Sequence, residues 1–131
     1  MIVLDASVLI AALTPADVHH RAARQLLDPA IIDNEDLKIN PVTLAEVLVL
    51  PARAGRATEV RDLVLNELGV IEVPFPQQAG LVLAQLRATG IKMPDCCVLM
   101  TAMDVGASLA SFDDRLRRAA TENGVALLPK N

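Results

Sequence analysis

The sequence predicts an α/β fold in which a central, mostly parallel sheet is covered by helices on both faces. Short β-rich runs alternate with longer helical runs along the whole chain, a pattern typical of parallel strands connected by helices. Apolar residues make up 53% of the 131 residues and aromatic residues only 2%, so the core must be aliphatic. No repeat or linker interrupts the alternation. Residues 1–131 are therefore expected to form a single domain.

The first half of the chain contains two expected strands. "MIVL" reads as a strand and "SVLIAAL" as a short helix. A second helix is expected from about Thr14 to Leu27, with Asp17 as its N-cap, and "IIDNED" as the loop that follows. "LKIN" is the second strand. Pro41 then opens a helix, with Asn40 or a nearby threonine as its cap.

Proline and glycine residues mark the expected helix ends in the rest of the chain. Pro51 should kink or end the helix that starts at Pro41. Gly69 fits the end of an amphipathic helix at 57–68, and Gly90 ends a helix at 76–90. The run at 94–106 is almost wholly apolar, so this helix should be central and buried. The remaining expected elements are a strand at 70–73, a strand at 107–111, a helix at 113–124 and a short strand at 125–129.

Charge and cysteine content limit the class of protein. The net charge of −4 argues against a passive nucleic-acid binder, but not against an enzyme that binds phosphates through a metal ion. Cys96 and Cys97 are adjacent and have no metal-ligand spacing, so we expect buried thiols in a reduced compartment. No signal peptide is visible, and no apolar run approaches the ~18 residues needed to span a membrane. We therefore expect a cytoplasmic protein.

Acidic residues recur where the expected strands end or helices begin. Asp5 follows the first strand, and Glu46 lies about one turn into the helix after the second strand. Asp95 starts the apolar helix, and Asp113 follows the strand at 107–111. In a parallel sheet the strands end at one edge, and ligands bind there. We therefore expect these carboxylates to converge.

Helix capping is the competing interpretation. Asp5 and Asp95 are each placed to cap a helix, and the segments 43–46 and 111–114 fit capping boxes. A cluster is the other possibility. Two unit charges ~4 Å apart repel by about 4 kcal/mol at an effective dielectric constant near 20, so four gathered carboxylates need a cation among them. Oxygen ligands of this kind suit Mg²⁺ or Mn²⁺ rather than zinc.

The acidic residues lie in four segments of the chain, "MIVLDASVLIAAL", "TLAEVLVLPARAG", "MPDCCVLMTAM" and "LASFDDRL". These segments resemble the signature segments of PIN-domain ribonucleases, above all the VapC-type toxins of bacterial toxin–antitoxin pairs. The likeness covers essentially the whole chain and implies a PIN-like three-layer fold. It also implies that one set of carboxylates forms the catalytic metal site: Asp5, Glu46, Asp95 and Asp113.

The resemblance assigns supporting roles as well. Ser7 and Ser111 match positions that commonly hold polar residues beside the site. Asp114 is adjacent to Asp113, so the fourth acid is open between the two, and we favour Asp113. The implied reaction is in-line attack by a metal-activated water on an RNA phosphodiester, with Mg²⁺ or Mn²⁺ as the cofactor.

RNA would be held without an aromatic platform, because neither phenylalanine is expected to stack on bases. Arginines are the available contacts, although each also fits a solvated surface. The adjacent pair His19–His20 is expected to be a solvated helix start rather than a pair of metal ligands. The candidate RNA contacts are Arg21, Arg24, Arg53, Arg56 and Arg115.

Three other readings compete with the ribonuclease. A haloacid-dehalogenase-type phosphatase also begins with a strand ending in aspartate, but it needs a second aspartate two residues later, where this chain has Ser7. A response-regulator receiver needs paired early acids and a later lysine that we cannot place. A catalytically degenerate PIN-like domain that only binds a partner is the third, and the intact acidic set argues against it.

The sequence also suggests partners. The mean hydropathy of +0.40 and the apolar residues of the helices at 42–50 and 59–68 exceed what one core needs, so we expect a homodimer. The resemblance to toxins implies a small antitoxin that inhibits the enzyme. No membrane association is expected.

Overall fold

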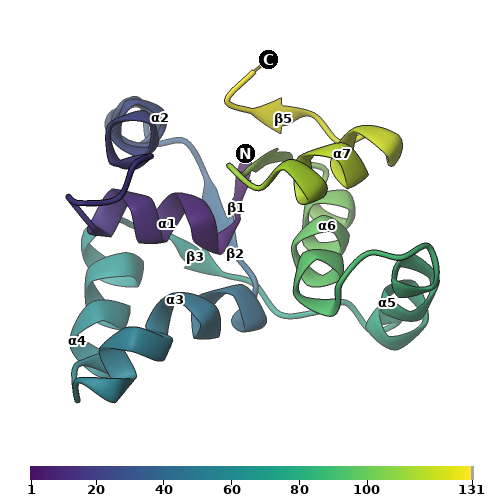
Figure 1. Ribbon diagram of the computed structural model, residues 1–131, viewed down its shortest axis with the longest axis horizontal. Coiled ribbons are helices and arrows are strands. Elements are labelled where there is room, and N and C mark those ends of the chain that lie inside the picture. Colours follow the sequence, from purple (N-terminus) through teal and green to yellow (C-terminus); the bar gives the residue numbers. More distant parts are fainter. Residues whose placement is uncertain (131) are drawn as a thin grey trace.

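One parallel sheet of five strands organises the part of the chain that the computed structural model describes, residues 1–130. The strand order is β3-β2-β1-β4-β5, which places β1 at the centre (Figure 1). Every neighbouring pair is parallel, so all the strands end at one edge of the sheet. The strands are β1 (Ile2–Leu4), β2 (Leu37–Ile39), β3 (Ile71–Glu72), β4 (Ser108–Ala110) and β5 (Leu127–Leu128).

Helices connect the strands and cover both faces of the sheet, as Figure 1 shows. Helices α1, α2 and α3 contribute to the cluster on one face, and α5, α6 and α7 contribute to the cluster on the other. The helices are α1 (Ala6–Leu13), α2 (His20–Ile32), α3 (Pro41–Arg53), α4 (Ala57–Asp62), the π-helical segment η1 (Leu63–Glu67), α5 (Ala79–Ala88), α6 (Met93–Val105) and α7 (Asp114–Glu122).

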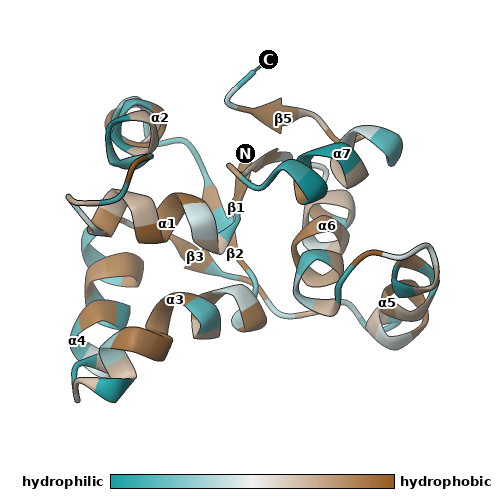
Figure 2. Cartoon of the chain, viewed as in Figure 1, coloured by the Kyte–Doolittle hydropathy of each residue, from teal (hydrophilic) through white to brown (hydrophobic). Residues whose placement is uncertain are grey.

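Two aliphatic clusters lie on opposite faces because side chains alternate along each strand. Ile2 and Leu4 of β1 pack with α1, α2 and α3, whereas Val3 packs with α6 and α7. Leu109 and Ala110 of β4 divide between the clusters in the same way. Figure 2 shows hydrophobic residues along the central strands and hydrophilic residues along much of α7. The predicted three-layer α/β fold with an aliphatic core is confirmed.

Helix α6 is buried from Cys96 to Ala102, as its apolar sequence predicted. Gly106 ends this helix in the left-handed conformation with φ of 68°, which glycine adopts without steric cost. Both cysteines are free and buried, and burial raises the pKa of each thiol. Within residues 1–130, no helix is both long enough and apolar enough to cross a membrane.

Two predicted helix boundaries were wrong. The second helix begins at His20 rather than near Thr14, because the Asp17 carboxylate accepts a hydrogen bond from the His19 N–H (2.8 Å) in a turn that precedes the helix. The same helix continues to Ile32 and includes Pro29, so the predicted loop starts too early. Burial of apolar side chains in its last turns outweighs the one backbone hydrogen bond that proline removes.

The helices around α3 also differ in detail from the prediction. Helix α3 continues past Pro51 and ends at Arg53. The amphipathic run at 57–68 is not one α-helix, because it changes to π-helical geometry at Leu63. Gly69 has φ of 74° after this run, where a helix end was expected.

Arg117 links α7 to the two strands at that side of the sheet. Its Nη1 donates hydrogen bonds to the carbonyl oxygens of Ser111 (2.9 Å) and Leu128 (3.2 Å). Its Nη2 donates to the carbonyl of Pro129 (2.7 Å). Strand β5 spans only two residues, so these bonds fix the chain where ladder pairing is short.

Arg117→Met is therefore expected to destabilise the protein by about 1–3 kcal/mol, because it keeps the aliphatic stem but removes the charged donor from three carbonyls, two of them in part-buried hydrogen bonds. The melting temperature should fall by several degrees in a domain of this size. Thermal unfolding followed by circular dichroism measures the change. Arg118→Met removes an exposed neighbour and serves as the control, and equal melting of the two variants would contradict the assigned role.

Candidate active site

The four predicted acids follow strand ends or start helices on the same side of the fold. Asp5 directly follows β1, and Glu46 lies in the second turn of α3. Asp95 lies in the first turn of α6, and Asp113 separates β4 from α7. Helix α3 packs against both α1 and α6, which brings these segments to a common space. Figure 1 shows α1 and α3 together beside α6.

Asp5 stands at the N-cap position of α1 but makes no capping hydrogen bond. Its Oδ2 instead accepts hydrogen bonds from the hydroxyls of Ser7 and Ser111, each at 2.8 Å. The residue is only 7% exposed, so these two donors compensate a carboxylate that is nearly removed from water. No donor among residues 1–130 reaches Oδ1, which leaves that oxygen for a ligand. The capping interpretation of Asp5 is wrong.

The backbone fixes the direction of both serine hydroxyls. Ser7 Oγ accepts a hydrogen bond from the N–H of Phe112 (3.1 Å), and Ser111 Oγ accepts one from the N–H of Asp113 (3.0 Å). Each hydroxyl therefore directs its own hydrogen toward Asp5. Two donors on one oxygen hold the orientation of the carboxylate.

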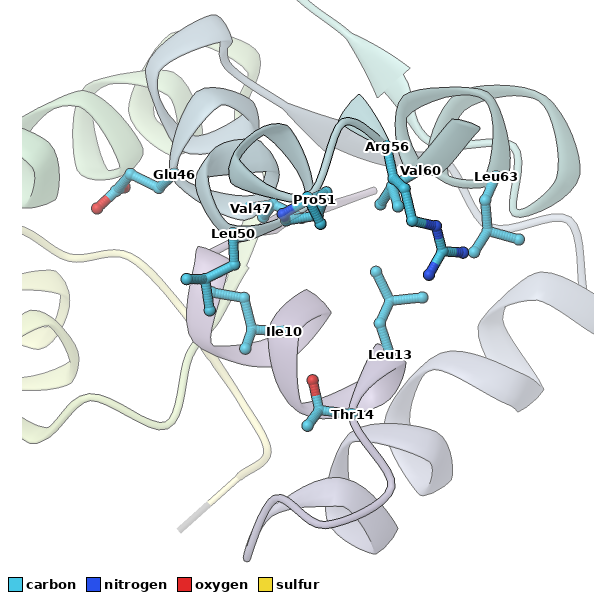
Figure 3. A pocket seen from close by; sticks show the side chains of 11 residues that line it. Ile10, Leu13, Thr14, Glu46, Val47, Leu50, Pro51, Arg56, Val60 and Leu63 are labelled. Atoms are coloured by element: carbon cyan, nitrogen blue, oxygen red, sulfur yellow. The ribbon is translucent and has the colours of Figure 1, made fainter. Parts of the chain in front are cut away.

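Glu46 does not close a capping box. The side chain of Asn40 caps α3 by accepting from the N–H of Thr43 (2.9 Å), while its Nδ2 donates to Thr43 Oγ1 (2.8 Å). Glu46 lies one turn further on, and Figure 3 shows its carboxylate directed away from the neighbouring apolar groove. Burial raises the pKa of Glu46, and the charges of Asp5 and Asp95 raise it further.

Asp95 is also not an N-cap, because the cap position of α6 belongs to Lys92. Burial raises the pKa of Asp95, and repulsion from Asp113 and Asp5 adds to the increase. Lys92 and Arg115 act in the opposite direction. The charges that raise the pKa values of Glu46 and Asp95 are those of other predicted acids, as expected if these carboxylates share one site.

Asp113 has two roles in the structure. Its Oδ1 accepts a hydrogen bond from the N–H of Leu116 (2.9 Å), so Asp113 caps α7, and the capping box predicted for Ser111 and Asp114 does not form. Asp113 nevertheless contributes to the electrostatic repulsion on Asp95. Asp114 lies exposed in the first turn of α7, and no perturbation of Glu46 or Asp95 is traced to it.

The donor chemistry of the site fits a hard divalent cation. All the candidate ligands are carboxylate oxygens, and among the ion pairs of residues 1–130 none involves these acids. As they lie, no three acidic, histidine or cysteine side chains in the described part of the chain surround a common point closely enough to hold a metal. Mg²⁺ keeps several of its waters and binds through one or two carboxylates, so it suits such an open arrangement.

The predicted RNA-binding arginines are dispersed. Arg24 pairs with Asp28 (2.9 Å) and Arg56 with Glu59 (3.0 Å), both on exposed helix surfaces. Arg115 acts on a carboxylate of the site, Asp95. Arg21 and Arg53 are exposed on α2 and α3. Only Arg115 of the five is thus linked to the acids.

The sequence analysis did not predict two features near the site: the position of Lys92 and the stacking of His19 on Phe112. Lys92 directly precedes the "MPD" of the third acidic segment, and its charge acts on Asp95. Phe112 lies between Ser111 and Asp113, and the ring of His19 stacks on it with centroids 4.7 Å apart. His20 turns elsewhere, with Nδ1 2.8 Å from the carbonyl of Ala11, so the two histidines do not form a ligand pair.

An apolar groove of about 400 Å³ adjoins Glu46. It runs between α1, α3 and the α4–η1 segment, and Figure 3 shows its walls. Leu50 is 69% exposed there, which is unusual for a leucine beside a core. The labelled lining consists of Ile10, Leu13, Thr14, Glu46, Val47, Leu50, Pro51, Arg56, Val60 and Leu63.

The sequence matches the family model of the PIN domain over residues 2–122. The chain belongs to the PIN-domain family. This match confirms the resemblance predicted from four segments, and it disfavours the phosphatase and receiver interpretations. No curated protein matches the sequence of this PIN domain.

Solved structures share the fold of this PIN domain. FitAcB from Neisseria gonorrhoeae has a TM-score of 0.72 at 23% identity, covering 100% of this chain and 97% of that chain. VapC20 from Mycobacterium tuberculosis, a sarcin–ricin loop cleaving toxin, has a TM-score of 0.72 at 16% identity, covering 91% and 95%. A toxin–antitoxin complex from Klebsiella pneumoniae has a TM-score of 0.68 at 21% identity, covering 86% and 87%.

Proposed function

We propose that this PIN domain is a divalent-metal-dependent endoribonuclease and the toxin of a toxin–antitoxin pair. The observation that carries the proposal is the setting of Asp5, a nearly buried carboxylate whose one oxygen is held by two serine hydroxyls while the other stays open. Glu46 and Asp95 lie close enough to Asp5 for its charge to raise the pKa of each. The fold shared with an RNA-cleaving toxin and with a toxin–antitoxin complex supports the same function.

The proposed reaction is hydrolysis of one phosphodiester bond. A water oxygen adds to phosphorus, the bond to the leaving nucleoside oxygen breaks, and that oxygen takes up a proton. Bound Mg²⁺ or Mn²⁺ would make the water more acidic and neutralise charge on the phosphate. Asp5 and Asp95 would hold the cation. Glu46 would bind it directly or through water, or position the attacking water.

Asp113 would contribute with the oxygen that does not cap α7. Its first oxygen is engaged by the N–H of Leu116, which fixes the carboxylate relative to the helix. The N–H of Asp113 is engaged by Ser111, which also holds Asp5. Ser111 thereby couples the positions of the first and fourth acids, and this coupling is the supporting role proposed for it. Asp114 remains an exposed neighbour in this scheme.

Incubation of purified protein with mixed cellular RNA tests the activity. Cleavage should appear with Mg²⁺ or Mn²⁺ and vanish with EDTA, and mapping of the new ends gives the cut site. Intact RNA after incubation of folded protein with either metal would reject the nuclease and leave the partner-binding domain as the alternative.

Expression of the chain alone is expected to slow bacterial growth, because an uninhibited ribonuclease depletes essential RNA. Growth curves after induction measure this effect, with Asp5→Asn at equal expression as the control. Normal growth with soluble, RNA-cleaving protein would reject the toxin assignment and leave the nuclease assignment standing.

The apolar groove supports an antitoxin partner. We propose that an apolar helix of the antitoxin lies between α1 and α3 and reaches Glu46 at the edge of the acidic site, where a cationic side chain would be favoured. A selection for small proteins that restore growth should recover the partner. Leu50→Asp should stay toxic but escape this rescue, and rescue equal to that of the parent would reject the groove as its binding site.

We also propose a homodimer. Apolar side chains stay exposed away from the groove, including Ile71 on the edge strand and Leu81 on α5. Within 59–68 the aliphatic side chains are buried or half-buried. The exposed apolar surface expected of the two helices therefore lies on α3, at Val49 and at Leu50, and of these two Leu50 belongs to the groove. Light scattering at micromolar concentration should give twice the mass of the chain, and a monomer mass would count against the dimer.

A further inference from the structure

A second cleft opens on the α7 side of the acidic site, away from the apolar groove. It lies between the connection from α5 to α6 and the exposed face of α7, and its volume is about 370 Å³. Asp95 forms part of its wall, so this cleft is continuous with the candidate active site. Its lining residues are Thr89, Gly90, Ile91, Lys92, Asp95, Arg115, Arg118, Ala119 and Glu122. We call it the basic cleft.

Three cations line the basic cleft against two carboxylates. Lys92 comes from the loop before α6, and Arg115 and Arg118 stand three residues apart on one face of α7. All three are exposed, and within residues 1–130 none of them takes part in an ion pair. Lys92 and Arg115 already act on Asp95. Because the three cations are exposed and unpaired within the described residues, their charge is available to an anionic ligand that reaches the acidic site.

The groove on the Glu46 side has the opposite character. Its lining is mainly aliphatic, and its one cation, Arg56, is paired with Glu59. Of these two clefts, the one beside α7 is therefore the one whose lining offers unpaired positive charge to a polyanion at the acidic site. The acidic site thus separates a surface suited to an apolar segment from a surface suited to phosphate.

We propose that the basic cleft binds the backbone phosphate of single-stranded RNA next to the phosphate that is cut, so that the strand leaves the site over α7. The proposal rests on the proposed ribonuclease function and specifies the side of the acidic site over which the RNA strand runs. Lys92, Arg115 and Arg118 bind this flanking phosphate, while Asp95 in the same wall belongs to the reacting centre. RNA and antitoxin then use different sides of the acidic site.

Steady-state cleavage of a labelled single-stranded RNA with Mn²⁺ tests the proposal. At a pH well above the raised pKa of Asp95, where this carboxyl is ionised with or without Lys92, Lys92→Gln with Arg118→Gln should raise KM about tenfold at low salt and leave kcat unchanged. A contact outside the reacting centre stabilises substrate and transition state equally. The dependence of log(kcat/KM) on log[salt] should become shallower by about 0.7 for each contact removed. Lys92→Arg should retain the parent KM, and Glu122→Gln should lower it.

A neutral linkage in the substrate locates the contact. Once the cut site is mapped, a methylphosphonate placed at the flanking linkage on one side of the cut should raise the KM of the parent. The same linkage should raise the KM of the double variant by less than it raises that of the parent, because Arg115 is then the only one of the three proposed contacts that remains. Methylphosphonate on the other side of the cut should act equally on parent and variant.

Arg61→Gln, which removes one exposed charge from α4, is the matched control and should leave KM unchanged. Parent-like KM and salt dependence in the double variant would overturn the basic cleft while the ribonuclease stands. A fall in kcat alone would also overturn it, since the cations would then act on the chemistry. Competition by poly-glutamate as strong as by RNA would assign the cleft to an acidic protein. A folded parent that cleaves no RNA would reject the ribonuclease itself.

Discussion

Asp5→Asn is expected to reduce metal-dependent RNA cleavage by about 100-fold or more, since loss of even the outer partners of a metal ligand costs 10–100-fold. The substitution keeps the size and shape of the side chain. It removes the charge that a cation needs and replaces one oxygen by an amide nitrogen. Cleavage of a fluorescent RNA by equal amounts of parent and variant measures the loss.

Asp104→Asn is the matched control for Asp5→Asn. Asp104 lies exposed near the end of α6 opposite Asp95, so its charge is remote from the site, and cleavage should remain at the parent level. Circular dichroism of both variants checks that they are folded. Parent-like cleavage by folded Asp5→Asn would remove Asp5 from the proposed metal site.

The order of strands and helices could largely be predicted from the sequence because local apolar patterns coincide with the final packing. The alternation of Ile2, Val3 and Leu4 between two clusters follows from strand geometry alone. The beginning of α2 could not be predicted in this way. Asp17 carries a strong capping signal, yet it stabilises a turn before the helix, and only the packing of the α1–α2 connection decides which occurs.

The candidate site shows a similar division. Convergence of the acids could be predicted because the strand ends of a parallel sheet meet at one edge. The choice between capping and clustering could not be made locally, and it differs from residue to residue. Asp5 is held by two serines, one of them 106 residues away, whereas Asp113 does cap its helix. The pairing of Arg24 and Arg56 with nearby acids, and the proximity of Lys92 to Asp95, likewise depend on side-chain placement.

Mn²⁺ is expected to raise the melting temperature by several degrees at pH 7.5 and by much less at pH 4.5, the ordinary pKa of a glutamate. The pKa values of Glu46 and Asp95 are raised from their ordinary values of 4.5 and 3.8. The folded protein therefore binds these protons more tightly than the unfolded chain does. As the pH rises from those ordinary values through the raised ones, the metal-free protein must lose stability.

A bound cation reverses this loss. Once the carboxylates are ionised they bind Mn²⁺, and a ligand at 100 times its Kd stabilises the folded state by about 2.7 kcal/mol. At pH 4.5 more than half of the Glu46 carboxyls of the metal-free folded protein are protonated, because their pKa is raised from 4.5. Protons then compete with Mn²⁺ for the same oxygens, so the stabilisation shrinks. Melting curves at both pH values, each with Mn²⁺ or with EDTA, separate the effect of metal from the effect of protons.

Glu46→Gln is the sharpest variant for this comparison. Among residues 1–130 the Glu46 carboxylate accepts no hydrogen bond, so glutamine removes a repelling charge and little else, whereas Asp5→Asn also disturbs two bonds to serine. In EDTA at pH 7.5 the variant should melt above the parent, because repulsion with Asp5 and Asp95 is relieved. Its Mn²⁺-induced shift should be smaller, while Asp104→Asn should match the parent in both conditions. If Mn²⁺ raised the melting temperature of Glu46→Gln as much as that of the parent, Glu46 would lie outside the metal site. The metal site would then not explain why α3 carries a charge at this position.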